Sequence, residues 1–148
     1  ISRPDTVDRH TLSNLKKSGI YTLNHVHSEI VDQAHQSAAR YEVNQSEFDE
    51  VGLTAEFLDG FKAPFVKESK VKLGLELRQI TPIELNGTIL IIGEVVLIEI
   101  DDDGIDNDGF IDLQKYDSTA VVGLDAYYQP KLIQRLSYAK PHESLKKV

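Results

Sequence analysis

Residues 71–100, VKLGLELRQITPIELNGTILIIGEVVLIEI, decide the fold. At the start of this stretch an apolar residue occupies every second position: Val71, Leu73, Leu75 and Leu77. Because side chains of a strand point alternately to opposite faces, this alternation indicates a strand with one buried face. Asn86-Gly87 is typical of a tight hairpin turn. We therefore predict two antiparallel strands joined by a hairpin, the second running from residue 88 to residue 100.

The second strand is apolar on both faces, through Ile89-Leu90-Ile91-Ile92 and Val95-Val96. A strand of this kind belongs inside a barrel or beneath a dimer interface. Gly93 interrupts it and predicts a bulge, a sharp bend or the close approach of another backbone. These strands are too few to close a barrel, and a lone hairpin with two apolar faces would aggregate. We expect the partner strands in a segment ahead of Ile1, in a second subunit, or in both.

Helical patterns dominate the first third of the chain. Periodic apolar positions predict a helix from residue 5 or 6 to residue 18, a second over 28–39 and a short one over 46–51, and residues 20–24 predict a strand. Residues that cap or end helices flank these patterns: Thr6, Gly19, Ser28, Ser46 and Gly52. The tail after Pro141 is polar and is expected to fray.

The composition is that of an ordinary globular domain, with 148 residues, 41% hydrophobic and 27% charged. A net charge of -8 argues against binding to nucleic acid or to anionic lipid, since an acidic surface repels phosphate. No run of about 18 apolar residues predicts a membrane span. Cysteine is absent, which excludes disulfides and thiolate zinc sites and fits a reducing compartment. We expect a cytoplasmic protein that binds neither nucleic acid nor membrane.

The chain begins with Ile1 and contains no methionine. An open reading frame starts with methionine, and a chain of this length without one is unusual. We therefore expect these residues to be part of a longer chain. A charged-then-apolar leader is not seen at the start, so a signal peptide is not expected.

The opening residues, ISRPDTVDRHTLSN, suggest an anion site. Arg3, Arg9, several hydroxyls and the amide of Asn14 run directly into the first predicted helix. Guanidinium groups and the N–H groups of a helix N-terminus can surround a phosphate. A capped, solvated surface helix explains the same residues equally well from spacing alone.

Three histidines invite a metal interpretation. His25 and His27 are separated by one residue, and His35 follows. Imidazole is the commonest metal ligand, but neither a carboxylate nor a further histidine stands at a recognisable ligand spacing. We therefore expect no metal here.

The acidic run 101–109, DDDGIDNDG, resembles a calcium loop. If Gly109 is the central glycine, Gly104 falls at the first ligand position and Lys115 at the last. Both residues are wrong for an EF-hand. We interpret the run as a solvated acidic loop that ends in turn residues.

An ordered set of short segments resembles one protein family. The segments are Arg9-His10-Thr11 with Asn14, Gly19–Asn24, Ser37–Tyr41, Glu47-Phe48, Gly52–Thr54, Ala63-Pro64, Glu68-Ser69, Ile92–Val95 and Gly123–Tyr128. In order and spacing they resemble the flavin reductase-like, FMN-binding split-barrel domains, a group that includes nitrilotriacetate monooxygenase reductase components and flavoredoxin. The resemblance implies a homodimer and a mainly β fold with flanking helices, a Greek-key split β-barrel. It implies a domain over residues 1–140, with its N-terminal strands missing from this chain, and a polar tail over 141–148.

The resemblance also implies where FMN binds. The residues implied at or near the phosphate are Arg9, His10, Thr11 and Asn14. Those implied beside the ribityl chain or the flavin ring are Ser2, Arg3, Asn24, His25, Tyr127 and Tyr128. An aromatic ring can cover the flat isoalloxazine. A surface salt bridge explains Arg3 as well, and core or interface packing explains the tyrosine pair as well.

The implied function is NAD(P)H:flavin reductase activity. A hydride passes from nicotinamide to FMN, and electrons then pass to free flavin, an oxygenase partner or another acceptor. The flavin supplies the chemistry, so no catalytic acid or base is named. Walker, GxSxG and GxGxxG motifs are absent, but the family is thought to stack nicotinamide on the flavin without a Rossmann domain. Two alternatives stay open: an FMN-binding electron-transfer protein without reductase turnover, and an interaction module that lost the cofactor.

Overall fold

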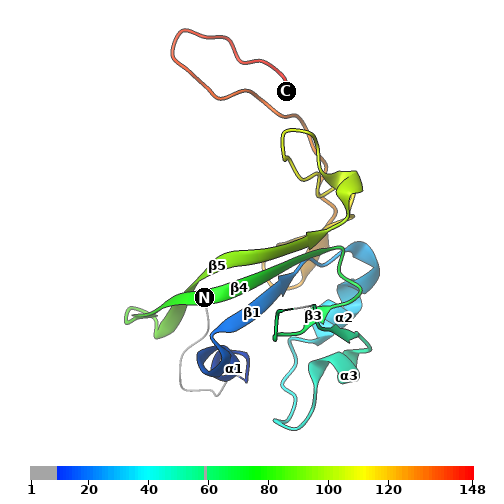
Figure 1. The fold of residues 1–148 in the computed structure, drawn as a ribbon, viewed down its shortest axis with the longest axis vertical. Helices are drawn as coiled ribbons and strands as arrows, with labels where there is room; N and C mark the ends of the chain where they lie inside the picture. The colour runs from blue at the N-terminus through cyan, green and yellow to red at the C-terminus, as the bar shows by residue number, and fades with distance from the viewer. Residues whose placement is uncertain (1–9, 59) are drawn as a thin grey trace.

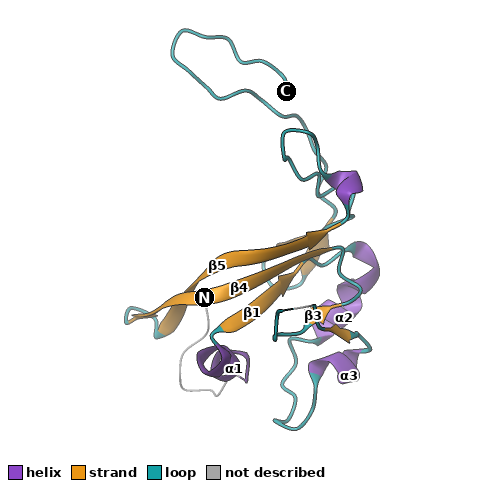
Figure 2. Ribbon diagram, in the orientation of Figure 1, coloured by secondary structure: helices purple, strands orange, loops and turns teal. Residues whose placement is uncertain are grey.

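The structure, a computed structural model, describes residues 10–58 and 60–148. The first elements are α1 (His10–Ser18), β1 (Ile20–Asn24), η1 (Ser28–Ile30), α2 (Val31–Gln36) and α3 (Glu47–Val51). Next come β2 (Ala55–Glu56), β3 (Phe65–Val66), β4 (Val71–Ile83) and β5 (Thr88–Ile100). The last are η2 (Asp102–Gly104), β6 (Ala120–Val122) and β7 (Ala126–Tyr128). The labelled helices lie to one side of the central sheet (Figure 1), and loop follows β7 (Figure 2).

The central sheet is antiparallel, with strand order β1-β4-β5. β4 and β5 form the predicted hairpin, and β1, also predicted, pairs with the first half of β4. The register of the hairpin shifts at two points, between Gly74 and Leu75 and between Leu77 and Gln79. Each shift leaves one residue unpaired, which bends the strands and increases their twist.

One face of the sheet is covered by the small β2–β3 hairpin and the segment that joins its strands. Phe61 and Phe65 are buried there, with ring centroids 5.3 Å apart. Lys72 of β4 is buried on the same side, and its ammonium group pairs with Glu56 of β2 at 2.6 Å and with Glu99 of β5 at 3.0 Å. This three-residue ion pair ties the small hairpin to the central sheet.

The opposite face of the sheet is apolar and partly open. Cross-strand partners share a face, and the register places six residues on this one: Tyr21, Leu23, Leu73, Leu75, Val95 and Ile98. Leu23 is 48% exposed and Ile98 is 54% exposed. Burial of β5 on both faces is therefore not achieved among the described residues. The cover that the sequence of β5 predicts therefore stays a prediction.

Gly93 of β5 lies against a side chain. A Cβ added at Gly93 would overlap the hydroxyl of Tyr21 and would lie 2.8 Å from its ring carbon Cζ. The predicted bulge lies directly beside it, because Leu77, the partner of Gly93, borders one of the register shifts. Of the three alternatives predicted for Gly93, the structure therefore shows the bulge, and the Tyr21 ring occupies the space beside the glycine.

Two helices end at the predicted glycines. The Gly19 N–H donates to the carbonyl of Leu15 at 2.9 Å, and Gly19 has a φ of +70°. Gly52 has a φ of +72° and follows α3 directly. Glycine adopts this left-handed backbone without steric cost, which is why it ends both helices. Thr6, the predicted cap of the first helix, lies outside the described residues.

The predicted helix over residues 28–39 is wrong in extent and in its cap. The segment starts as η1, continues as α2 and leaves helical structure after Gln36. The Ser28 hydroxyl and N–H both donate to the carboxylate of Asp117, the N–H at 3.2 Å. A hydroxyl placed against a distant carboxylate does not cap the helix. The hydrophobic period carries no information about such a long-range bond.

Residues 129–148, which we call the C-terminal arm, lead away from the sheet (Figure 1). The arm turns back on itself, because the Ser137 N–H donates to the carbonyl of Lys146 at 2.8 Å and the Val148 N–H to that of Arg135 at 3.1 Å. The tail expected to fray therefore makes backbone hydrogen bonds within the arm.

The accessible surface is large for the chain's mass. The chain exposes 10731 Å², whereas a compact monomer of 16.6 kDa exposes about 7,600 Å². The difference is about 3,100 Å², and the open sheet face and the projecting arm contribute to it. Among the described helices, none has the length and apolarity needed to cross a bilayer.

Candidate functional site

The candidate site lies where the segment after β1 meets the segment before β6. The Thr119 N–H and hydroxyl both donate to the carbonyl of Val26, at 2.8 and 2.9 Å. His27 and Ser118 form an isolated antiparallel bridge. These bonds fix residues 25–28 against residues 117–119, which are far apart in sequence.

His25 faces Ser118 across this junction. The His25 Nδ1 and the Ser118 hydroxyl oxygen lie 3.3 Å apart, and Ser118 is only 5% exposed. The Ser69 hydroxyl donates to the His25 carbonyl at 2.8 Å, which holds the backbone. Burial lowers the pKa of His25, because desolvation disfavours the charged imidazolium. The site therefore holds a neutral imidazole that can donate or accept a hydrogen bond near neutral pH.

His27 is buried beside this pair and has a structural role. Its Nε2 lies 2.9 Å from the carbonyl oxygen of Glu68. Its Nδ1 makes no hydrogen bond and lies 3.7 Å from a carboxylate oxygen of Glu29. Within the described part of the chain, no three histidine, aspartate or glutamate side chains gather as a metal site does.

Asp117 has a strained backbone and a highly ordered carboxylate. Its φ is +56°, in the left-handed region that non-glycine residues rarely adopt. Its carboxylate accepts hydrogen bonds from Ser28 and, at 2.6 Å, from the Gln129 amide. The Ser28 hydrogen bond is the main reason why the pKa of Asp117 lies below its ordinary value. These bonds hold the loop in a shape that its own backbone does not favour.

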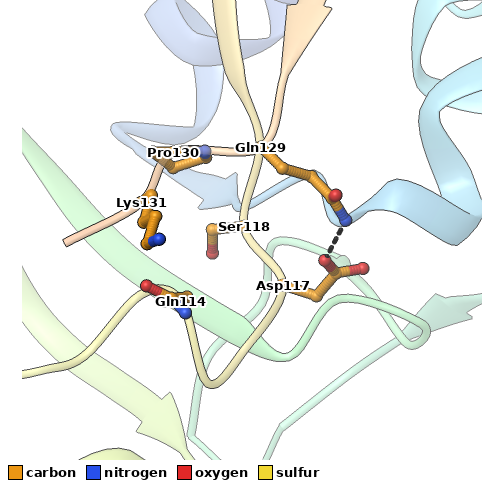
Figure 3. Close-up of a pocket in the computed structure, with 6 residues that line it drawn as sticks. All are labelled: Gln114, Asp117, Ser118, Gln129, Pro130 and Lys131. Carbon is orange, nitrogen blue, oxygen red and sulfur yellow. Dashed lines mark hydrogen bonds between the residues drawn. The ribbon is translucent and has the colours of Figure 1, made fainter.

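A polar pocket of about 380 Å³ opens beside Ser118. It is lined by Gln114, Asp117, Ser118, Gln129, Pro130 and Lys131. In Figure 3, Ser118 lies between Gln114 and Lys131 on one side and the hydrogen-bonded Asp117–Gln129 pair on the other. Hydroxyl, amide and ammonium groups can bind the polar parts of a small ligand here.

Tyr127 reaches the same region from β7. Its hydroxyl lies 3.2 Å from His35 Nδ1, and the two rings meet edge to face with centroids 5.8 Å apart. Tyr128 is its neighbour and is exposed. Gln129 follows Tyr128 directly and donates to Asp117, so the segment after β7 reaches the junction that also holds His25.

Asn24, predicted near the ring, is bound to the sheet and to β3. The Val66 N–H donates to the side-chain oxygen Oδ1 of Asn24 at 3.0 Å, and the side-chain nitrogen Nδ2 of Asn24 donates to the Thr22 hydroxyl at 3.1 Å. The side chain therefore joins β1 to β3. Its predicted contact with a ligand stays a prediction.

The described residues predicted to bind the phosphate lie in α1, before the start of β1, whereas the junction lies after the end of β1. His10 is half-buried in the first turn of α1, and Thr11 and Asn14 are exposed. The first turn of α1 contains no acidic side chain, and Lys16 and Lys17 stand in its last turn. Ser2, Arg3 and Arg9 lie outside the described residues. The described candidates thus fall into an α1 group and a group at the His25–Ser118 junction.

Three residues of the junction were missed by the sequence analysis. Ser118, Asp117 and Gln129 carry its hydrogen bonds, yet aspartate and serine are common in any turn. The nearest local signal is the pair Asp117-Ser118 ahead of the apolar residues 120–122. That pattern indicates a turn and gives no hint of a partner 93 positions away in sequence.

Residues 6–120 match the family described as flavin reductase like domain. The chain belongs to the flavin reductase-like domain family. A split-barrel protein of Shewanella frigidimarina NCIMB 400, provisionally described as a flavin reductase, is 48% identical, with a TM-score of 0.86 over 88% of this chain and 66% of its own. Nitrilotriacetate monooxygenase component B of Bacillus cereus is 20% identical, with a TM-score of 0.78 over 89% of this chain and 67% of its own.

Among curated relatives, an uncharacterized protein of Aquifex aeolicus (strain VF5) is 27% identical over 115 residues, which are 78% of this chain. The present chain spans 58% of that relative's length. The family predicted from the sequence is confirmed, and so is the mainly β split-barrel fold with flanking helices. The open three-stranded sheet is compatible with a split barrel.

Proposed function

We propose that the protein is an FMN-dependent oxidoreductase that accepts a hydride from NADH or NADPH and passes electrons to free flavin or another acceptor. The observation that carries the proposal is the flavin reductase-like family match over residues 6–120. The 48% identity to a split-barrel protein provisionally described as a flavin reductase supports it. Bound FMN supplies the hydride-accepting ring, so the protein's task is to bind and orient.

The α1 group fits a phosphate. The helix has nine residues, and its first turn carries no carboxylate that would repel an anion. Thr11 and Asn14 are exposed there and offer a hydroxyl and an amide. We assign these two residues, with His10 and Arg9, to the phosphate end of FMN. The positive end of the helix dipole favours the same charge.

The junction group fits the ring end of a flavin. Tyr127 and Tyr128 offer aromatic surface against a flat ring, and His25, kept neutral by burial, offers one ring nitrogen as donor or acceptor. We assign these three residues, with Ser2, Arg3 and Asn24, to the neighbourhood of the ribityl chain and the ring. The hydride transfer requires no proton-transferring side chain, so these residues position the reactants and exclude water.

Stopped-flow reduction tests the proposal. The purified protein is loaded with FMN and mixed anaerobically with NADH or NADPH, and the flavin absorbance is followed. Prompt bleaching supports the reductase. FMN that binds but bleaches only very slowly identifies a passive electron carrier. A protein that takes up no added FMN is the cofactor-free interaction module. Either of the last two results rejects the proposal.

Two variants test the phosphate assignment. Arg9→Ala should weaken FMN binding about tenfold or more, because a charge-assisted hydrogen bond to phosphate is lost. Lys16→Ala removes the same charge from the last turn of α1 and should leave FMN affinity unchanged. Equal losses in both variants would mean that only net charge matters, and the assignment of Arg9 would be wrong.

The proposal includes a homodimer. The apolar sheet face with Leu23, Leu73 and Ile98 supports it, and so does an accessible surface about 3,100 Å² above that of a compact monomer. A stable dimer buries about 800 Å² or more on each partner. The proposal also takes residues 1–140 as the functional domain. An oxygenase is one candidate electron acceptor.

A further inference from the structure

The C-terminal arm carries apolar side chains that contact no core. Six of them are exposed: Leu132, Ile133, Leu136, Tyr138, Leu145 and Val148. Ile133 is 91% exposed and Tyr138 is 87% exposed. The backbone bonds that close the arm hold these side chains in an ordered segment. Ordered apolar side chains facing solvent are typical of an interaction surface.

The base of the arm is fixed, and this directs the rest of it outward. Arg135 pairs with Asp106 at 3.0 Å and with Asp108, and its guanidinium lies 4.0 Å from the centroid of the Phe110 ring. The Leu132 N–H donates to the Gln114 side chain at 3.1 Å. Beyond these anchors the arm projects away from the sheet of its own chain (Figure 1).

The arm and the rest of the chain have opposite charge. The arm contains five basic residues and one acidic one: Lys131, Arg135, Lys140, Lys146 and Lys147 against Glu143. Its net charge is therefore +4, and because the whole chain carries -8, residues 1–128 carry -12. A basic apolar arm on an acidic body favours association of the arm with another body of the same kind.

We propose that the C-terminal arm of each subunit docks on the acidic body of a second copy of this chain. The proposal rests on the homodimer proposed above and adds the element that is exchanged. Both complementary surfaces belong to one chain, so a two-fold dimer satisfies both arms at once. The exposed area in excess of a compact monomer, about 3,100 Å², is ample for such an interface, which needs about 800 Å² per partner.

Isotope-mixed cross-linking tests the exchange directly. Protein labelled with nitrogen-15 and unlabelled protein are mixed, diluted so that subunits exchange, reconcentrated and treated with a zero-length carbodiimide. Lysine–carboxylate cross-links are then identified by mass spectrometry. We expect the cross-links of Lys146 and Lys147 to body carboxylates to include pairs that join labelled with unlabelled peptides, in the proportion that random exchange of subunits gives. Cross-links that join only peptides of one label would show that the arm folds onto its own body and would overturn the proposal.

A charge-reversal pair supplies a second measurement. Lys146→Glu/Lys147→Glu should raise the dimer dissociation constant about tenfold in sedimentation velocity, because attraction at the interface becomes repulsion. Lys62→Glu/Lys67→Glu is the control, since both residues are exposed in the body and the variant has the same net charge. Equal effects in the two variants would overturn the arm as the docking element.

These results separate the arm from the other proposals. A protein that sediments as a monomer at every concentration overturns the homodimer and the exchange together. A dimer whose arm cross-links stay within one label overturns the exchange and leaves the homodimer standing. Neither measurement reads flavin, so FMN binding and reduction are decided independently.

Discussion

Replacing Gly104 with alanine should destabilise the protein far more than the same change at Gly109, five residues away. Gly104 ends η2 and is packed against the ring of Tyr116, which is 4% exposed. A Cβ added at Gly104 would overlap this ring. The Gly104 N–H also donates to the Tyr116 hydroxyl at 2.9 Å, and that hydroxyl donates to the Asp101 carbonyl. The ring is therefore held on two sides and cannot move aside freely.

The magnitude follows from these contacts. Overpacking a buried site costs about 1–3 kcal/mol, and loss of the Gly104 hydrogen bond adds about 1 kcal/mol or more. We therefore expect Gly104→Ala to lower the free energy of unfolding by about 2–4 kcal/mol. Gly109 has nothing within 4 Å of the added atom and a φ of +82°. Its alanine variant meets only backbone strain, which costs about 1–2 kcal/mol.

Urea unfolding of the cofactor-free protein measures both variants, with the midpoint and the slope compared against the parent. Tyr116→Phe separates the two contributions, since it keeps the ring and removes its hydrogen bonds. If Gly104→Ala and Gly109→Ala differ by less than about 0.5 kcal/mol, the packing of Gly104 on Tyr116 is not as described. Because Tyr116 directly precedes Asp117 and Ser118, Gly104→Ala should also disturb the His25–Ser118 junction.

Three further outcomes are expected. Burial lowers the pKa of His25, so the unfolded chain binds a proton more readily than the folded chain, and the free energy of unfolding should fall as the pH drops below about 6.5. Urea unfolding of His25→Gln should show a shallower fall with pH. The same pH dependence in the variant and the parent would argue against a role of His25. Lys72→Met leaves Glu56 and Glu99 facing each other without their cation and should lower the free energy of unfolding by about 2 kcal/mol. Thermal unfolding measures this loss, and an unchanged melting temperature would contradict it. Gly93→Ala should displace the Tyr21 ring, lower stability by about 1–3 kcal/mol and alter the near-ultraviolet circular dichroism, whereas an unaltered spectrum would mean that the ring does not lie there.

The hairpin could be predicted because its signals are local. Residues 71–77 alternate, Asn86-Gly87 turns, and residues 88–100 extend the second strand. Gly19 and Gly52 ended helices for an equally local reason, the left-handed backbone. The predicted cap of the helix over 28–39 was wrong because Ser28 is held by Asp117, a residue 89 positions away. Helix propensity is a property of the local segment alone, and here the tertiary contact with Asp117 outweighs it.

The candidate site was only half predictable. His25 and Tyr127 were identified through the family resemblance, and the structure brings their segments to one junction. The partner side chains, Ser118, Asp117 and Gln129, belong to turns whose composition is common to many loops. The open sheet face also shows what local sequence patterns cannot predict. The sequence of β5 predicts that this face is covered, but no local pattern indicates which segment covers it.

The most direct measurement of the central claim compares FMN with riboflavin, which differ by the phosphate alone. Equilibrium titrations followed by flavin fluorescence give the two dissociation constants at fixed ionic strength. If the N-terminal residues and the first turn of α1 hold the phosphate, FMN binds at least about tenfold more tightly than riboflavin, and added salt narrows the difference. Equal affinity for the two flavins, or none for either, would contradict the account.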